Sequence, residues 1–251
     1  MYRGQGIVRR YPIYILLDVS ESMRHPPPAG GPTPQEVFCG LFSELVLDLA
    51  NSPALSPAAW LGLIAFSERV EIVRDLLPLQ PTLPVREPRN GVETDYAEAL
   101  RVLGERFEHD TDRIRSDGRQ RGFDVKLHRP LIFFITDGAP YTGGRYQHPG
   151  EWLPHRNRLT APPAHARIAS VGLPGAHERT LWRMATGGHD DGQHPRNAFI
   201  ARPSVDSRSL ARSVINTIRR SITLSVRTGD LVIGVPDDMR YARRQAPRAS
   251  A

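Results

Sequence analysis

Short runs of apolar residues alternate along the chain with segments in which apolar residues recur every three or four positions. Apolar runs without polar alternation are typical of strands buried on both faces of a parallel sheet. They occur at 13–17, 60–66, 131–135, 166–172 and 198–200. Segments that repeat every four positions are typical of helices with one face against a sheet. They begin near Pro34, near Tyr96, around 177–186 and after Ser204, which is predicted to cap the last helix. The alternation predicts an α/β fold in three layers with a mostly parallel central sheet.

One edge strand is expected to run antiparallel. Ser67-Glu68-Arg69 is predicted to be a hairpin turn that leads into a short alternating strand at 70–73. A capping box is predicted at the helix that begins at Pro34, with Thr33 as the cap and Glu36 as its partner.

Length and composition are consistent with one domain and a tail. The chain has 251 residues, of which 39% are hydrophobic and 24% charged, as in ordinary globular proteins. We expect a domain over 1–226 that contains a charged, solvated insertion at 108–129 and a long exposed loop at 139–163. An extension of the preceding helix is the alternative for 108–129. Residues 227–251 are predicted to form a disordered basic tail with one candidate strand at 231–233.

The chain is basic, with a net charge of +6 and a pI of about 10. Lys126 is the only lysine, so the charge comes from arginine. Either the composition is biased toward arginine, or a partner carries acidic or phosphate groups. The first explanation is favoured, because no basic stripe interleaved with aromatic residues occurs, and nucleic-acid binding is therefore not expected.

A single cysteine, Cys39, excludes an internal disulfide and is expected to be a small buried hydrophobic residue. The sequence shows no signal-peptide pattern and no apolar segment of membrane-spanning length. We therefore expect a cytoplasmic protein without a membrane partner.

Side chains with oxygen atoms follow two of the predicted central strands. Asp18, Ser20 and Ser22 come directly after the first strand, and Asp137 follows the strand at 131–135. Thr94 stands where a loop becomes a helix. Ligands of open α/β sheets bind at the carboxyl ends of the strands, and oxygen ligands suit Mg²⁺ or Mn²⁺. For the first stretch alone, a turn stabilised by its own Asp and Ser side chains is the alternative.

The order D-x-S-x-S, then a threonine, then T-D-G resembles the metal-ion-dependent adhesion site (MIDAS) of von Willebrand factor A domains, over roughly residues 10–222. Within that superfamily the chain looks most similar to the bacterial tellurium-resistance type. This finer resemblance is carried by R-R-x-P at Arg9–Pro12, D-x-S-x-S-M at Asp18–Met23 and the segment Asp75–Leu79.

The resemblance implies a metal-dependent protein-interaction module and not an enzyme. The family pattern makes the two serines direct ligands, the threonine a direct or water-mediated ligand, and the aspartates mainly holders of coordinated water. The implied metal ligands are Asp18, Ser20, Ser22, Thr94 and Asp137. A partner protein would offer an Asp or Glu to the open position, beside a rim of Arg24, Arg145 and Arg156. The resemblance also implies a Ser/Thr kinase and a metal-dependent phosphatase as partners, in stress response or phage defence.

One departure from the family pattern is Glu93, which stands where related proteins often have glycine before the threonine. Glu93 either adds a carboxylate near the site or points to solvent. Among histidine-containing segments, His148, Glu151 and His155 are expected to contact a partner without forming a zinc site. The segment from His189 to His194 is expected to be a solvated loop.

Two other functional classes remain as alternatives. A phosphohydrolase would use Asp18 as nucleophile, but Ser20 stands where haloacid-dehalogenase-type enzymes place a second aspartate. The chain also has neither a phosphate-binding G-x-x-x-x-G-K-[ST] loop nor a G-x-S-x-G elbow. An arginine-mediated nucleic-acid binder would lose affinity steeply with salt, whereas a metal-dependent module would lose it with chelator.

Overall fold

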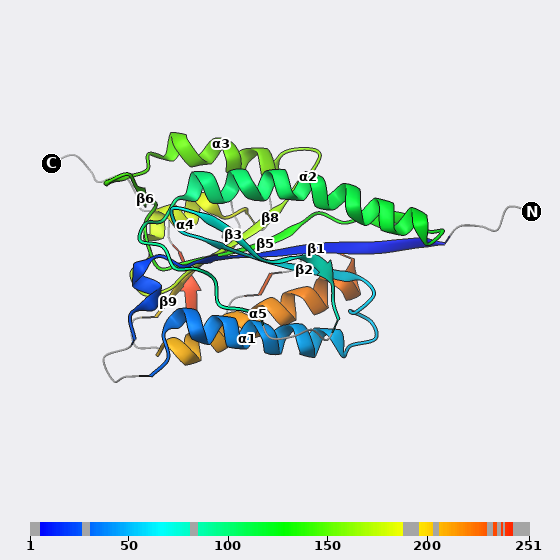
Figure 1. Cartoon of the computed structure of the whole chain (residues 1–251), viewed down its shortest axis with the longest axis horizontal. Helices are drawn as coiled ribbons and strands as arrows, with labels where there is room; N and C mark the ends of the chain where they lie inside the picture. The colour runs from blue at the N-terminus through cyan, green and yellow to red at the C-terminus, as the bar shows by residue number, and fades with distance from the viewer. Residues whose placement is uncertain are drawn as a thin grey trace, which may run out of the picture.

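A mostly parallel eight-stranded sheet forms the middle layer of the protein (Figure 1). The computed structural model describes residues 6–26, 31–80, 85–187, 196–202, 206–229, 233–234, 237 and 239–242. The strands follow the order β10-β9-β8-β5-β1-β2-β3, and β4 pairs with the first part of β1. Their bounds are β1 Ile7–Asp18, β2 Ala59–Phe66, β3 Val70–Pro78, β4 Asp124–Leu127, β5 Leu131–Thr136, β8 Arg167–Gly172, β9 Ala198–Ala201 and β10 Met239–Tyr241.

Helices cover both faces of this sheet, which confirms the predicted three-layer α/β fold. α1 (Pro34–Ala50) and α5 (Ser207–Thr228) pack together on one face. α2 (Tyr96–Gln120), α3 (Pro149–Thr160) and α4 (Glu178–Met184) lie on the other face (Figure 1). The predicted capping box of α1 is present, since Thr33 Oγ1 accepts a hydrogen bond from the Glu36 backbone N–H.

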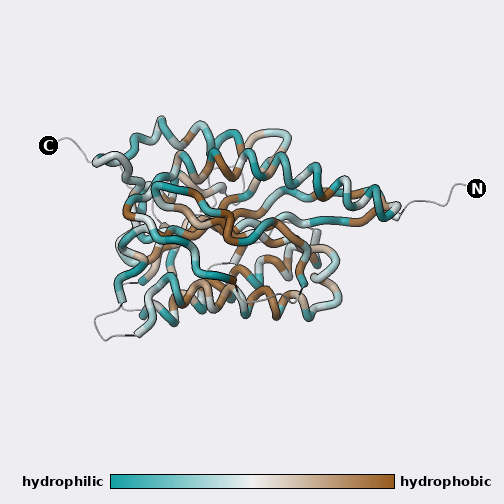
Figure 2. The backbone as a smooth tube through the Cα atoms, in the orientation of Figure 1, coloured by the Kyte–Doolittle hydropathy of each residue, from teal (hydrophilic) through white to brown (hydrophobic). Residues whose placement is uncertain are grey.

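Side chains of β1 alternate between two hydrophobic cores, which explains why this strand is an uninterrupted apolar run. Ile13, Ile15 and Leu17 belong to the core under α1 and α5. Tyr14 and Leu16 belong to the core under α2 and α3. The backbone trace coloured by hydropathy shows the apolar residues concentrated between the layers (Figure 2). As expected, the single cysteine is buried in the first core.

Both edges of the sheet are antiparallel. β3 returns beside β2 after the turn at Ser67–Arg69, as predicted. At the other edge β10 pairs antiparallel with β9, which was not predicted. β10 lies inside the segment 227–251 that was expected to be a disordered tail, so part of that segment belongs to the sheet. Of the candidate strand at 231–233, only Ile233 is described, and it packs against the first core without forming a strand.

α5 begins and ends at signals other than those predicted. Its N-cap is Asp206, whose carboxylate accepts hydrogen bonds from the backbone N–H groups of Arg208 and Ser209. The predicted cap, Ser204, lies outside the described residues. The helix ends at Thr228, followed by Gly229 with φ of 77°, a left-handed conformation that glycine adopts without strain.

For residues 108–129 the alternative prediction, an extension of the preceding helix, agrees with the structure: α2 extends to Gln120, and β4 follows it. A buried polar cluster interrupts the apolar face of this part of the helix, to which Ile114 belongs. The carboxylate of Asp110 is 1% exposed, accepts a hydrogen bond from Tyr14 Oη at 3.0 Å and forms an ion pair with Arg113 at 3.0 Å. Satisfied buried charges of this kind leave no hydrophobic pattern for the sequence to show.

The predicted exposed loop at 139–163 is wrong. It contains a small hairpin, β6 (Tyr141–Thr142) and β7 (Arg145–Tyr146), and then α3. α3 is anchored by Trp152 and Leu159, both buried. Pro154 lies inside this helix. Among the described residues, no helix is both long enough and apolar enough to cross a membrane.

Candidate metal centre

Asp18 stands at the carboxyl end of β1, next to the end of β5. The two strands pair in parallel up to Leu17 and Ile135, so the residues that follow them meet at one edge of the sheet. The Asp18 carboxylate accepts a hydrogen bond from Thr136 Oγ1 at 2.6 Å and another from the Ser20 backbone N–H at 2.9 Å. These two bonds fix the orientation of the carboxylate.

The loop after Asp18 folds back as a short 3₁₀ helix, Glu21–Arg24, which is held by the fully buried side chain of Met23. This turn brings the Ser20 and Ser22 hydroxyl oxygens to 3.3 Å from each other. Ser22 Oγ also donates a hydrogen bond to Asp137 Oδ1 at 2.8 Å. The D-x-S-x-S loop and the T-D-G turn are therefore in direct contact.

Thr94 reaches the same region from the loop before α2. Its backbone pairs with Tyr141, with N–O distances of 2.8 and 2.9 Å. A Cβ built on Gly138 would lie 3.6 Å from Thr94 Oγ1, so this hydroxyl faces the T-D-G turn. The neighbouring Asp95 instead caps α2 by accepting a hydrogen bond from the Glu98 backbone N–H.

The structure thus gathers all five predicted residues from three loops, although their role as ligands stays a prediction. The arrangement carries an excess of negative charge. Asp18 is 0% exposed, and its burial, followed by the charge of Asp137, raises the pKa of Asp18 to about 7. Burial also raises the pKa of Asp137, against the lowering effect of the Ser22 hydroxyl. Among the described residues neither carboxylate forms an ion pair, and the charge of His25 has the smallest lowering effect on the pKa of Asp137.

These donors fit a hard divalent cation. They are two carboxylates and three hydroxyls, all oxygen, with no sulfur or imidazole among them. A cation placed between Asp18 and Asp137 would stabilise the charged form of both carboxylates. The described residues contain no group of three or more His, Cys, Asp or Glu side chains that could hold a metal ion. A candidate centre here therefore depends on its serine and threonine hydroxyls.

Tyr96 helps to position the residues of the site through hydrogen bonds, and it was not predicted from the sequence. It is buried at the start of α2, and its hydroxyl donates toward Thr136 Oγ1 at 3.2 Å and the Gly138 carbonyl at 3.1 Å. It therefore helps to orient the Thr136 hydroxyl that donates to Asp18. Only its position two residues after Thr94, at a helix start, distinguishes it in the sequence.

Glu93 takes a place that neither sequence interpretation anticipated. Its carboxylate accepts hydrogen bonds from Thr142 Oγ1 at 2.9 Å and from the backbone N–H groups of Gly143 and Gly144 at 3.0 and 3.4 Å. These bonds lower the pKa of Glu93. Both glycines have positive φ, which directs their N–H groups to this carboxylate. Glu93 therefore ties the Thr94 loop to the tip of the β6–β7 hairpin.

The predicted arginine rim is only partly present. Arg24 donates a hydrogen bond to the Gly91 carbonyl, and Arg145 forms a two-pronged ion pair with Glu151 at 2.9 and 2.8 Å. Arg156 does not lie at the rim. It donates to the carbonyls of Met184 and Ala185, at the end of α4 that points away from the carboxyl ends of the strands.

His148 and His155 lie at the start of helix α3 and within it. His148 is the N-cap of α3 and Glu151 completes its capping box, while His155 lies in the second turn of that helix. These positions hold α3 in place, and their contact with a partner stays a prediction. His189, Asp190, Asp191 and His194 lie outside the described residues.

Comparison with known proteins places this geometry in a family. A sequence model of the von Willebrand factor type A domain matches residues 13–139, a span that includes all five candidate ligands. No curated protein matches the chain.

Three solved structures resemble the fold. Proximal thread matrix protein 1 from the mussel byssus, solved with a zinc-occupied MIDAS motif, has 17% identity and a TM-score of 0.53 over 87% of this chain and 49% of its own. A von Willebrand factor type A protein from Catenulispora acidiphila has 15% identity and a TM-score of 0.55 over 86% of this chain and 43% of its own. The pilus adhesin SpaC from Lactobacillus rhamnosus GG has 14% identity and a TM-score of 0.58 over 87% of this chain and 31% of its own. The chain thus spans half or less of each of these structures.

Proposed function

Because this chain belongs to the von Willebrand factor type A domain family, we propose that it is a metal-ion-dependent protein-interaction module and not an enzyme. The observation that carries the proposal is the contact between the D-x-S-x-S loop and the T-D-G turn around two carboxylates, of which Asp18 is fully buried and Asp137 half-buried. Asp18, Ser20, Ser22, Thr94 and Asp137 would hold the ion. Mg²⁺ or Mn²⁺ is proposed because all five donors are oxygen.

When bound, the ion supplies an electron-poor coordination position that an Asp or Glu carboxylate of a partner protein can occupy. The residues of this chain prepare that position. Thr136 and the Ser20 backbone N–H hold the Asp18 carboxylate in one orientation. The neutral hydroxyls of Ser20, Ser22 and Thr94 add donors without adding negative charge, so an anionic partner group is not repelled.

Isothermal titration calorimetry with Mg²⁺, Mn²⁺ and Zn²⁺ tests the metal site. Zn²⁺ is included because a structural relative was solved with zinc in its MIDAS motif. Asp18→Ala is expected to lose ion binding while keeping its circular dichroism spectrum, because Asp18 lies past the end of the core run of β1. Asp48→Ala is the matched control, since Asp48 is an exposed carboxylate paired with Arg219 on the helical face. Wild-type affinity in Asp18→Ala would refute the site.

The protein partner can be sought by pull-down with and without chelator. Once it is found, removing its acidic side chain should weaken binding about as much as chelation does. The two effects should not add, because they break the same contact. Fully additive losses would show that the ion and the carboxylate act at separate places.

Both alternatives receive less support from the geometry. As a phosphohydrolase nucleophile Asp18 is poorly placed, because it is fully buried and both of its oxygens accept hydrogen bonds. Hydrolysis of p-nitrophenyl phosphate that disappears in Asp18→Ala would favour that class. A nucleic-acid binder would show a steep decrease of affinity with salt and no response to chelator.

The finer assignment rests on the resemblance at Arg9–Pro12, Asp18–Met23 and Asp75–Leu79. On that basis we include in the proposal a role in the cytoplasm of a bacterium, in stress response or phage defence of the tellurium-resistance type. The partners would be a Ser/Thr kinase and a metal-dependent phosphatase. Their absence from a metal-dependent pull-down that captures other proteins would contradict this assignment.

A further inference from the structure

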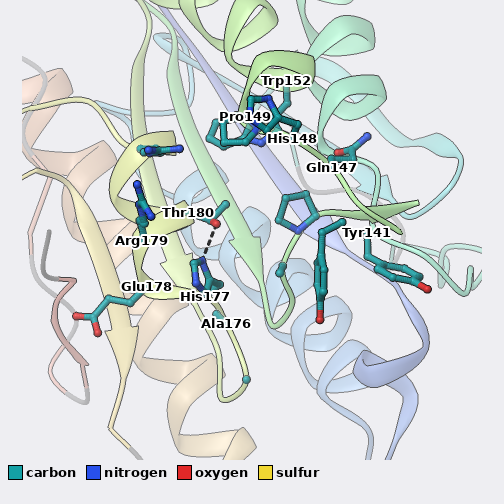
Figure 3. A pocket seen from close by; sticks show the side chains of 15 residues that line it. Tyr141, Gln147, His148, Pro149, Trp152, Ala176, His177, Glu178, Arg179 and Thr180 are labelled. Carbon is teal, nitrogen blue, oxygen red and sulfur yellow. Dashed lines mark hydrogen bonds between the residues drawn. The ribbon is translucent and has the colours of Figure 1, made fainter. Parts of the chain in front are cut away.

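A cavity of about 870 Å³ opens beside the candidate metal centre. One wall is the β6–β7 hairpin with the start of α3, and the other is the loop after β8 with α4 (Figure 3). We call it the hairpin cavity. The side chains that matter for the argument are Tyr141, Tyr146, His148, Trp152, Arg179 and Arg183. Its volume is in the range of sites that bind small molecules or anchor side chains of a peptide.

Two arginines give the α4 wall a positive charge. Arg179 is exposed and Arg183 half-buried, and neither forms a hydrogen bond or ion pair within the part of the chain that the structure describes. The one acidic residue of the lining, Glu178, is paired with Arg240 at 2.6 Å. Its carboxylate points away from the Tyr141 wall (Figure 3). The cavity therefore favours an anionic group.

The opposite wall offers aromatic surface. Tyr141 is 39% exposed and Tyr146 71% exposed, and their rings pack edge to face with centroids 5.4 Å apart. Trp152 borders the cavity from behind this surface: it is 1% exposed, and its indole N–H has no hydrogen-bond partner among the described residues. Tyrosine and arginine are among the residues that most often dominate binding energy at protein interfaces.

The hairpin cavity and the metal centre are built from the same segments. Ala139 and Pro140 line the cavity and follow directly after the T-D-G turn. Tyr141 pairs with the backbone of Thr94. A Cβ built on Gly175 would lie 2.8 Å from the Asp137 carbonyl oxygen, so the loop after β8 packs against that turn. A partner chain that reaches the metal centre is therefore already at the mouth of the cavity.

We infer that the hairpin cavity is a second docking site, which takes an acidic segment of the partner protein next to the residue that reaches the metal. This inference depends on the proposed function in one point only, that a neighbouring residue of the partner binds the metal ion. The cavity itself binds through Arg179 and Arg183, which pair with carboxylates, and through the tyrosines, which pack on the segment between them.

The probe is a short fluorescein-labelled peptide of alternating Glu and Ala, with a Gln–Ala peptide as its neutral counterpart. Fluorescence anisotropy on the full chain should show binding of the Glu–Ala peptide only. Arg179→Gln with Arg183→Gln should weaken it about tenfold, both with Mg²⁺ and with chelator. Arg115→Gln with Arg119→Gln is the matched control, because these exposed arginines at the far end of α2 carry the same charge and should not matter. Equal weakening in both double variants would overturn the inference, since the binding would then be diffuse attraction to a basic protein.

The indole N–H signal of Trp152 in ¹⁵N-edited NMR spectra gives a readout at the cavity itself. The signal is assigned by its loss in Trp152→Phe, and it should shift with the Glu–Ala peptide and stay unmoved with the neutral one. A stationary signal, or a shift produced equally by inorganic phosphate, would overturn the acidic-segment assignment.

The outcomes of these experiments distinguish a failure of the docking-site inference from a failure of the proposed metal-binding function. If Asp18→Ala and chelator leave peptide binding intact while the Arg179–Arg183 variant weakens it, the cavity stands whether or not a metal ion takes part. If metal binding by calorimetry is intact and the Arg179–Arg183 variant binds the peptide normally, the metal centre stands and the cavity is overturned.

Discussion

With chelator present, Asp18→Asn is expected to abolish a loss of stability that the wild-type protein shows as the pH rises toward neutrality. The folded structure raises the pKa of Asp18 from 3.8 to about 7 through burial and the charge of Asp137. Between these values the folded carboxyl group keeps its proton while the unfolded one has released it. The folded state then binds more protons than the unfolded state, so the free energy of unfolding falls as the pH rises.

The magnitude follows from that interval. Below 3.8 the group is protonated in both states and its contribution is fully present, and above about 7 the loss is complete. At about 1.4 kcal/mol for each pH unit, the loss amounts to roughly 4 kcal/mol. Asparagine must rearrange one of the two hydrogen bonds from Ser20 and Thr136, at a cost of about 1 kcal/mol. At alkaline pH the variant is therefore expected to be more stable than the metal-free wild type by roughly 3 kcal/mol.

Urea unfolding at a series of pH values measures this effect. The difference in unfolding free energy between Asp18→Asn and wild type isolates one group from the other carboxylates that titrate. Asp48→Asn, at an exposed site, should show a flat difference. Saturating Mg²⁺ should remove the wild-type deficit, since a ligand at 100 times its dissociation constant adds about 2.7 kcal/mol. A difference that does not change between pH 4 and about 8 would refute the electrostatic reasoning.

Two further substitutions test the supports of the site. Gly91→Ala should lower metal affinity on the order of tenfold by displacing the Thr94 loop, because a Cβ there would lie 2.1 Å from Ser67 Oγ. Gly104→Ala, with nothing within 4 Å of the added atom, is its control, and equal calorimetric affinity in both variants would contradict the reasoning. Tyr14→Phe should lower the unfolding free energy by roughly 1.5–3 kcal/mol through loss of its hydrogen bond to buried Asp110, with metal affinity unchanged. Chemical denaturation measures the change in unfolding free energy of Tyr14→Phe. A denaturation midpoint equal to that of the wild type would show that the Tyr14–Asp110 hydrogen bond does not contribute to stability.

The parts of the fold that burial decides could be predicted from the sequence. Strands β1, β2 and β5 are apolar on both faces, and the carboxyl ends of β1 and β5 lead directly to Asp18 and Asp137. The carboxyl ends of parallel strands lie at one edge of the sheet, independent of the conformation of the loops that connect them. The D-x-S-x-S and T-D-G spacings then indicated which oxygens would meet.

The parts that polar contacts decide could not be predicted. The second half of α2 contains the charged cluster around Asp110, and the β6–β7 hairpin is held by the carboxylate of Glu93. Neither leaves a hydrophobic period in the sequence. Pro154, inside α3, favoured a loop there. β10 has three residues, too few for alternation to distinguish it from a polar tail.

One of the polar contacts that escaped prediction, that of Glu93, also joins the metal centre to the hairpin cavity. Glu93 and Thr94 are adjacent, and each bonds to the hairpin, one by its carboxylate to Thr142 and one by its backbone to Tyr141. Asp18 and Asp137, in contrast, follow directly from the paired strands β1 and β5. The candidate centre is therefore built on the sheet on one side and on the wall of the hairpin cavity on the other. Because Tyr141 and Tyr146 line the cavity from the same hairpin, a partner segment bound there would lie against the element that holds the Thr94 loop.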